Sequence, residues 1–198
     1  MRMSSPIVVG LAALLCGCPI ISEDLANQKS AAYAPYAPYA NGGGWTVDQD
    51  CIDYLSVTDI QSGDIAEGFS LEDQHGDTVV LHHFCNQVVL IMAVAIWDGG
   101  SSSISEDLQV LYETYKEQGF LPMALLGEGD PTDWSEAFDL TYPVLSDEGF
   151  RQFRELYDPD SQEPLSIPSG VLLKPGLEVV WKGLGWEITA DEIESYLP

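Results

Sequence analysis

The chain has 198 residues, of which 45% are hydrophobic, and this is enough to form the core of one globular domain. It carries 32 Asp and Glu residues against 7 Lys and Arg residues, so its formal net charge at pH 7 is -25. A surface of this charge repels nucleic-acid phosphates and anionic lipid headgroups. It therefore excludes nucleic-acid binding and limits membrane attachment to a covalent lipid or an apolar segment.

The N-terminus predicts export and lipid attachment. A short positive start precedes an apolar run over residues 6–15, which is too short to span a bilayer and suits a secretory signal. The letters LCGC at 15–18 resemble a bacterial lipobox, so we expect a signal peptide over 1–17 and a lipid on Cys18. Pro19 is not the aspartate of inner-membrane retention, which favours the outer membrane. The alternative is an ordinary signal peptide with two incidental cysteines.

Residues 18–45 predict a flexible tether. A Tyr-Ala-Pro repeat over 32–40 favours extended conformations, and three glycines follow Asn41. We interpret the segment as a spacer between the lipid and a domain over 46–198, and the alternative is a displayed recognition motif.

Strands and helices alternate along this domain. The expected elements are a hairpin (69–73 with 78–81), a buried strand (88–95), a helix (103–118), a strand (121–126), a helix (133–138), a strand (142–145), a helix (150–157), a second hairpin (169–173 with 177–181) and a last helix (189–197). Ser103 and Glu106 have the spacing of a capping box at the start of the first helix. This order predicts an α/β sandwich around a mixed sheet.

Two stretches carry a resemblance to a known family. Residues 81–101, LHHFCNQVVLIMAVAIWDGGS, resemble the thioredoxin-fold redoxins, including the alkyl hydroperoxide reductase-like proteins and the thiol–disulfide exchange lipoproteins. Residues 166–180 resemble the proline loop, strand, turn and final strand of the same fold. The matching positions in the first stretch are Leu81, Phe84, Val89, Leu90, Ala95 and Trp97. The resemblance covers about residues 63–198 and implies a thioredoxin-like three-layer α/β/α sandwich with a mixed central sheet.

The family's catalytic cysteines are replaced in this chain. In the redoxins a C-x-x-C motif follows the tryptophan, and the matching positions here hold Asp98 and Ser101. Neither side chain can exchange with a disulfide, so the resemblance implies a redoxin without its catalytic dithiol. Asp98 instead suits a helix N-cap, worth about 0.3–1 kcal/mol through its charge, and Ser101 suits a polar first turn. No cysteine fits the peroxidatic position either.

The resemblance also implies a cis peptide bond between Ile167 and Pro168. A cis proline exposes a backbone edge that can pair with an extended segment by strand addition. We therefore expect Trp97, Ile167 and Pro168 to form a binding groove for an extended peptide or an envelope protein. The alternative is a trans proline at the start of a strand.

Cys51 and Cys85 predict a disulfide, because an even pair of cysteines in an exported protein is usually bonded. The bond would add about 3–4 kcal/mol of stability. Cys85 precedes a strand about 25 Å long that ends near Trp97, so it cannot replace the missing thiol. The neighbouring His82 and His83 point to opposite faces of an extended stretch, and we expect neither a metal nor a cofactor.

Three functions remain open at this point. The first is a peptide-binding or protein-binding module on a redoxin fold. The second is an active thiol–disulfide oxidoreductase or antioxidant protein that uses Cys51 and Cys85. The third is a structural lipoprotein of the cell envelope.

Overall fold

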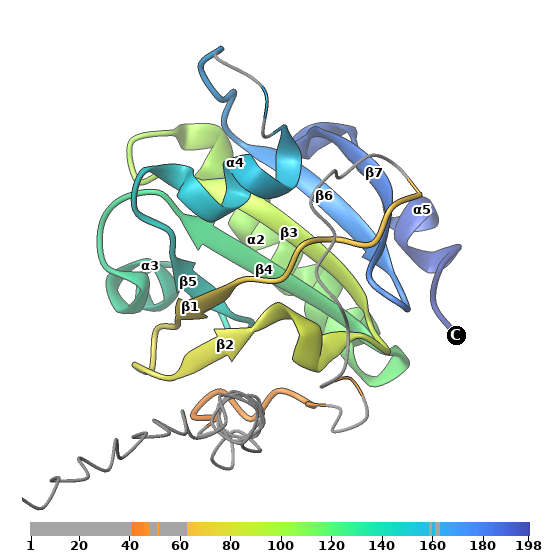
Figure 1. Cartoon of the computed structure of the whole chain (residues 1–198). Helices are drawn as coiled ribbons and strands as arrows, with labels where there is room; N and C mark the ends of the chain where they lie inside the picture. Colours follow the sequence, from red (N-terminus) through yellow and green to blue (C-terminus); the bar gives the residue numbers. More distant parts are fainter. Residues whose placement is uncertain (1–40, 48–50, 52–62, 159, 161–162) are drawn as a thin grey trace, which may run out of the picture. The chain divides into compact units, whose positions relative to one another are not determined.

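A computed structural model describes residues 41–47, 51, 63–158, 160 and 163–198 (Figure 1). The predicted signal peptide, the predicted lipidation site Cys18 and most of the predicted tether lie outside these residues. None of the helices in the described ranges combines the length and the hydrophobicity that a membrane span requires.

A mixed sheet with the order β5-β4-β3-β6-β7 forms the centre of the fold. Its strands are β3 (Val88–Val94), β4 (Phe120–Leu126), β5 (Val144–Ser146), β6 (Ser169–Lys174) and β7 (Glu178–Leu184). The pairs β3–β4 and β4–β5 are parallel, whereas β3–β6 and β6–β7 are antiparallel. Every residue of β3 and β4 is buried, because their continuous apolar sequences are covered on both faces of the sheet.

The remaining elements surround this sheet. A separate antiparallel hairpin pairs β1 (Ser70–Glu72) with β2 (Thr78–Val80). The α-helices are α2 (Gly99–Tyr115), α3 (Pro131–Ala137), α4 (Arg151–Tyr157) and α5 (Ala190–Glu194). The short 3₁₀ helices are η2 (Leu81–Phe84), η3 (Lys116–Gln118), η4 (Glu148–Phe150) and η5 (Gly185–Glu187).

The helices form two outer layers. Figure 1 shows α4 in front of the sheet and α2 behind it. The indole N–H of Trp134 donates to Ser105 Oγ at 3.2 Å and joins α3 to α2, while the Tyr115 hydroxyl hydrogen bonds with Glu194 and joins α5 to α2. The predicted three-layer α/β/α sandwich of the thioredoxin type is therefore confirmed.

The start of α2 differs from the prediction. The helix begins at Gly99 rather than at Ser103, and its N-cap is Asp98, whose side chain accepts a hydrogen bond from the backbone N–H of Ser101. Ser103 therefore lies inside the helix, and the predicted capping box with Glu106 is wrong. The cap at Asp98, five residues upstream of Ser103, already satisfies exposed backbone donors at the start of the helix.

Trp45, which precedes the predicted domain, belongs to the core. Its side chain is 4% exposed, and its indole N–H donates to the Thr141 carbonyl at 2.9 Å. The end of the tether segment therefore packs against the residues that follow α3.

Candidate functional site

The loop between β3 and α2 crosses the carboxyl edge of the sheet. It carries two exposed apolar side chains, Ile96 (53% exposed) and Trp97 (67% exposed). The loop after the parallel strand β4 lies beside it, because the N–H of Gly127 donates to the Val94 carbonyl at 3.2 Å. This edge therefore presents apolar surface next to the following loop, which is the usual place for a site in an open parallel sheet.

Asp98 and Ser101 hold the loop in place. Asp98 Oδ2 accepts the Ser101 backbone N–H at 2.6 Å and the Ser101 hydroxyl at 2.9 Å. Ser101 Oγ in turn accepts the backbone N–H of Ala95 at 3.1 Å. Ser101 is fully buried. The predicted capping role of Asp98 is confirmed, and Ser101 does more than expected because it also satisfies a buried N–H of the loop.

Neither the carboxylate of Asp98 nor the hydroxyl of Ser101 can exchange with a disulfide. The Ser101 hydroxyl is buried and donates to a carboxylate, whereas a serine nucleophile needs a base and access to substrate. Asp98 caps the N-terminus of α2 with a carboxylate, which is not a thiolate nucleophile. The arrangement stabilises the loop that carries the exposed side chains of Ile96 and Trp97.

The peptide bond between Ile167 and Pro168 is cis, as predicted. Pro168 lies against the start of α2, because a Cβ atom built on Gly100 would be 3.2 Å from its Cδ. Its carbonyl accepts the Gly185 N–H at 2.9 Å, which fixes the start of η5 beside it. Pro168 is therefore held between the start of α2 and the residues that follow β7.

An apolar groove of about 520 Å³ extends from Pro168 along α2. Its apolar lining residues are Ile104, Leu108, Val110, Leu111, Pro168 and Ile188. Of the three predicted groove residues, only Pro168 lines it, whereas Trp97 and Ile167 do not. Sequence reasoning did not find this groove. In the structure Val110, which lines it, is a large apolar residue that is 66% exposed.

An acidic cavity of about 580 Å³ lies at the β1–β2 turn. It is lined by residues 72–76 of this turn, 129–132 after β4, and Ser146 at the end of β5. Gly129 connects it to the loop described above, because a Cβ atom built there would be 3.1 Å from Ile96 Cγ2. The sequence analysis did not predict this cavity.

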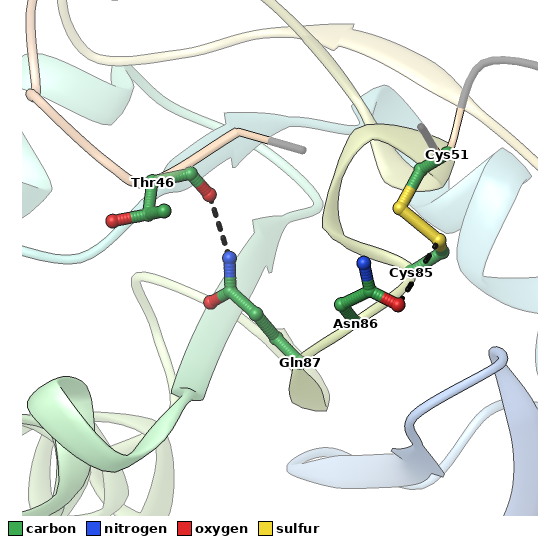
Figure 2. The surroundings of a disulfide bond; sticks show 5 residues. All are labelled: Thr46, Cys51, Cys85, Asn86 and Gln87. Atoms are coloured by element: carbon green, nitrogen blue, oxygen red, sulfur yellow. Dashed lines mark hydrogen bonds between the residues drawn. A yellow bond between two sulfur atoms is a disulfide. The ribbon is translucent and has the colours of Figure 1, made fainter. Parts of the chain in front are cut away.

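The disulfide between Cys51 and Cys85 is present, with 5.5 Å between the two Cα atoms (Figure 2). Both cysteines are buried. In the same region Gln87 Nε2 donates to the Thr46 carbonyl at 2.6 Å. Cys85 precedes β3 and Trp97 follows it, so the seven-residue strand, about 23 Å long, separates the disulfide from the loop.

His82 and His83 of η2 lie beside this disulfide in sequence. Burial lowers the pKa of both imidazoles, and a backbone hydrogen bond with Ala66 partly opposes this for His82. Cys85 is bonded to Cys51 and is not a free thiolate ligand. Within the described part of the chain, no three His, Cys, Asp or Glu side chains are grouped as a metal site.

Solved structures of redox proteins share this fold. A thiol:disulfide interchange protein of the thioredoxin family from Chlorobium tepidum matches with a TM-score of 0.57 and 15% identity, over 71% of this chain and 99% of that one. A secreted thiol-disulfide isomerase from Corynebacterium glutamicum matches with a TM-score of 0.56 and 19% identity, over 67% of this chain and 82% of that one. Peroxidoxin BcpB from Mycobacterium tuberculosis matches with a TM-score of 0.55 and 16% identity, over 69% of this chain and 93% of that one.

The family assignment comes from the sequence match. No curated protein matches the chain. The AhpC/TSA family matches residues 62–182, which are more than half of the chain and include the β3–α2 loop, the cis proline and most of β7. The chain therefore belongs to the AhpC/TSA family.

Proposed function

We propose that this chain is an exported, lipid-anchored redoxin-fold protein that binds an extended peptide or an envelope protein and does not exchange disulfides. One observation carries the proposal. Asp98 and Ser101 stand where the redoxins place their two cysteines, and they are hydrogen bonded to each other beside the cis proline, Pro168. On this proposal, the backbone edge at Pro168 still binds a segment, whereas Asp98 and Ser101 replace the cysteine pair.

The remaining cysteines do not supply a substitute dithiol. Disulfide exchange requires an accessible thiolate that attacks one sulfur of the substrate. Cys51 and Cys85 are both buried and bonded to each other, and they lie at the other end of β3 from Trp97. Their position favours a structural role, which argues against the oxidoreductase alternative.

The surface at the carboxyl edge favours binding. Ile96 and Trp97 are exposed on the loop, and the apolar groove begins at Pro168 on the far side of the helix start. Exposed apolar surface of this kind is typical of interaction sites. An extended segment could pair with the backbone near Pro168 and place apolar side chains along α2.

Export and anchoring rest on the N-terminal pattern. The signal-like residues 1–17 and the lipobox-like cysteine, Cys18, support a lipid-anchored protein of the bacterial envelope, and the outer membrane is the proposed location. The Cys51–Cys85 disulfide supports an oxidising compartment. The Corynebacterium neighbour is described as secreted, which agrees with export.

A reductase assay tests the absence of disulfide exchange. The full-length native chain and an Asp98→Cys/Ser101→Cys variant are compared in the reduction of insulin, with dithiothreitol as the electron source. We expect the native chain to match the rate without protein and the double variant to exceed it. Native activity that disappears in Cys85→Ala would instead establish the oxidoreductase alternative.

Peptide selection tests the binding function. A display library of random ten-residue peptides is selected on the full-length chain, and the affinities of enriched peptides are then measured for variants. We expect Trp97→Ala and Val110→Ala to weaken binding, because both side chains are exposed apolar surface at the proposed site. The control, Glu117→Gln, changes an acidic residue of the cavity that Trp45 and Phe120 also line. Failure to enrich any peptide, or equal losses in all three variants, would refute the proposal.

A further inference from the structure

The side chain of Asn41 fastens residues 41–47 to one conformation. Its Oδ1 accepts the backbone N–H of Trp45 at 3.0 Å, and its Nδ2 donates to the Trp45 carbonyl. The Asn41 carbonyl also accepts the N–H of Gly44 at 3.0 Å, which closes the turn between them. A side-chain amide can bind both backbone groups of Trp45 because it carries a donor and an acceptor. We call the two bonds between the Asn41 amide and Trp45 the latch.

The latch positions a core residue. The Trp45 side chain is buried, and its indole N–H donates to the Thr141 carbonyl at 2.9 Å. The next residue, Thr46, is held from outside the segment, because its carbonyl accepts Gln87 Nε2 at 2.6 Å (Figure 2). Opening the latch therefore loosens the backbone that carries Trp45 into the core.

The latch residue is followed by glycine, and an Asn-Gly pair can lose ammonia. The other asparagines, Asn27 and Asn86, are each followed by glutamine. In the reaction the nitrogen of Gly42 bonds to Cγ of Asn41, the Cγ–Nδ2 bond breaks, and the proton of the Gly42 nitrogen leaves with ammonia. Glycine favours ring closure because it has no side chain to obstruct it. Water then opens the succinimide ring at either carbonyl and gives aspartate or isoaspartate.

The latched conformation commits both reacting groups. The Asn41 amide is bonded to Trp45, and the Gly42 N–H donates to Asp77 Oδ2 at 2.6 Å. The departing ammonia contains Nδ2 itself, so the reaction removes the donor to the Trp45 carbonyl. Deamidation should therefore proceed from conformations in which the latch is open, at a rate that follows their population.

Neither product can form the latch again. An ionised carboxylate only accepts hydrogen bonds, so the oxygen that replaces Nδ2 faces the Trp45 carbonyl as a second acceptor. Isoaspartate also adds a methylene group to the main chain between residues 41 and 42. The new charge is close to the Asp77 carboxylate, which binds the adjacent Gly42 N–H and repels it.

We propose that Asn41 is a deamidation site, and that loss of its side-chain amide releases Trp45 from the core irreversibly. The Cys51–Cys85 disulfide keeps the N-terminal segment joined to the end of η2, so the release leaves the sheet and its helices in place. The modification is a one-way switch whose rate is set by how often the latch opens.

Deamidation rates test the control by the latch. The full-length chain is incubated in mildly alkaline buffer, and mass spectrometry of a proteolytic peptide follows the conversion of Asn41. We expect the folded chain to react at least about tenfold more slowly than the same chain in concentrated urea, because the latch must open first. Equal rates in the two conditions would overturn the proposal.

A variant outside the reacting pair sharpens this test. Gln87→Ala removes the bond to Thr46 without changing Asn41 or Gly42, and it should accelerate deamidation of the folded chain. The control is Gln118→Ala, which replaces an exposed glutamine of η3 and should leave the rate unchanged. An equal rate in the native chain and Gln87→Ala would contradict control by the latch.

The consequence is tested with Asn41→Asp, which reproduces one product. Its control of equal net charge is Gln118→Glu. Hydrogen exchange of the Trp45 indole N–H, followed by nuclear magnetic resonance, reports whether the indole keeps its place at the Thr141 carbonyl. We expect exchange at least about tenfold faster in Asn41→Asp than in the native chain and the control, with amides of β3 and β4 unchanged. Unchanged protection of the indole in Asn41→Asp would overturn the proposed release.

Discussion

Ser101 links the β3–α2 loop to the first turn of α2 through a single buried hydroxyl. Its Oγ accepts the Ala95 N–H and donates to Asp98 Oδ2. We expect Ser101→Ala to lower the free energy of unfolding by about 1–3 kcal/mol, because the buried N–H of Ala95 loses its acceptor. Urea denaturation followed by circular dichroism measures this change.

Ser103→Ala is the matched control for that experiment. Ser103 is exposed on the same helix, so its replacement should change stability by no more than about 0.5 kcal/mol. Equal midpoints for the two variants would show that the hydroxyl of Ser101 does not hold the loop.

At the scale of elements, the Cys51–Cys85 disulfide fastens the N-terminal segment to the end of η2. Removing it with a Cys51→Ala/Cys85→Ala variant should cost about 3–4 kcal/mol, because the unfolded chain regains the entropy of the open loop. Thermal unfolding of the native chain and the variant, each without reductant, measures the loss. A native chain whose melting temperature matches that of the variant would contradict a stabilising role.

The element η2 should make stability depend on pH. Burial lowers the pKa of His82 and His83 in the folded chain, so the unfolded chain binds protons more readily below the ordinary histidine pKa of about 6.5. The contribution of these histidines to stability is therefore fully present above about pH 6.5. The free energy of unfolding should fall as the pH drops below about 6.5 toward the lowered pKa values of the folded chain. Urea midpoints between about pH 5.5 and 7.5 measure the slope, and a His82→Gln/His83→Gln variant should flatten it. An unchanged slope in the variant would assign it to other groups.

Most elements could be predicted from the sequence, and the exceptions have physical reasons. The central strands are continuous apolar runs, which is why β3 and β4 were predicted within one residue. The start of α2 was missed because Gly99 and Gly100 have low helix propensity, so periodicity begins only after them.

The site was predictable only in part. The role of Asp98 and the cis bond before Pro168 followed from the resemblance to the redoxins. The apolar groove joins α2 to Pro168 and Ile188, and the acidic cavity joins three segments. Such surfaces depend on tertiary packing, which can be read neither from the alternation of apolar and polar residues nor from the spacing of motifs.

At the scale of the whole molecule, the net charge of -25 opposes the compact state. Two ion pairs among the described residues, Lys116–Glu113 and Lys174–Glu178, are partly exposed and contribute little. Raising NaCl from 0.1 M to 1 M shortens the screening length from about 10 Å to about 3 Å. We therefore expect the melting temperature to rise with salt, as scanning calorimetry in NaCl and KCl would measure. A melting temperature that falls with both salts would show that attractive pairs dominate.

The interlocked bonds of Ala95, Asp98 and Ser101 also constrain how this loop can evolve. A cysteine pair at positions 98 and 101 requires two substitutions. Asp98→Cys removes the acceptor of both bonds from Ser101, and Ser101→Cys removes the hydroxyl that donates to Asp98 and accepts from Ala95. Neither intermediate has a resolving thiol, and each leaves an odd cysteine open to intermolecular pairing. Because the two positions are coupled, their effects are not independent. A thiol pair at positions 98 and 101 therefore forms only when both residues change, and each single change costs the loop at least one hydrogen bond.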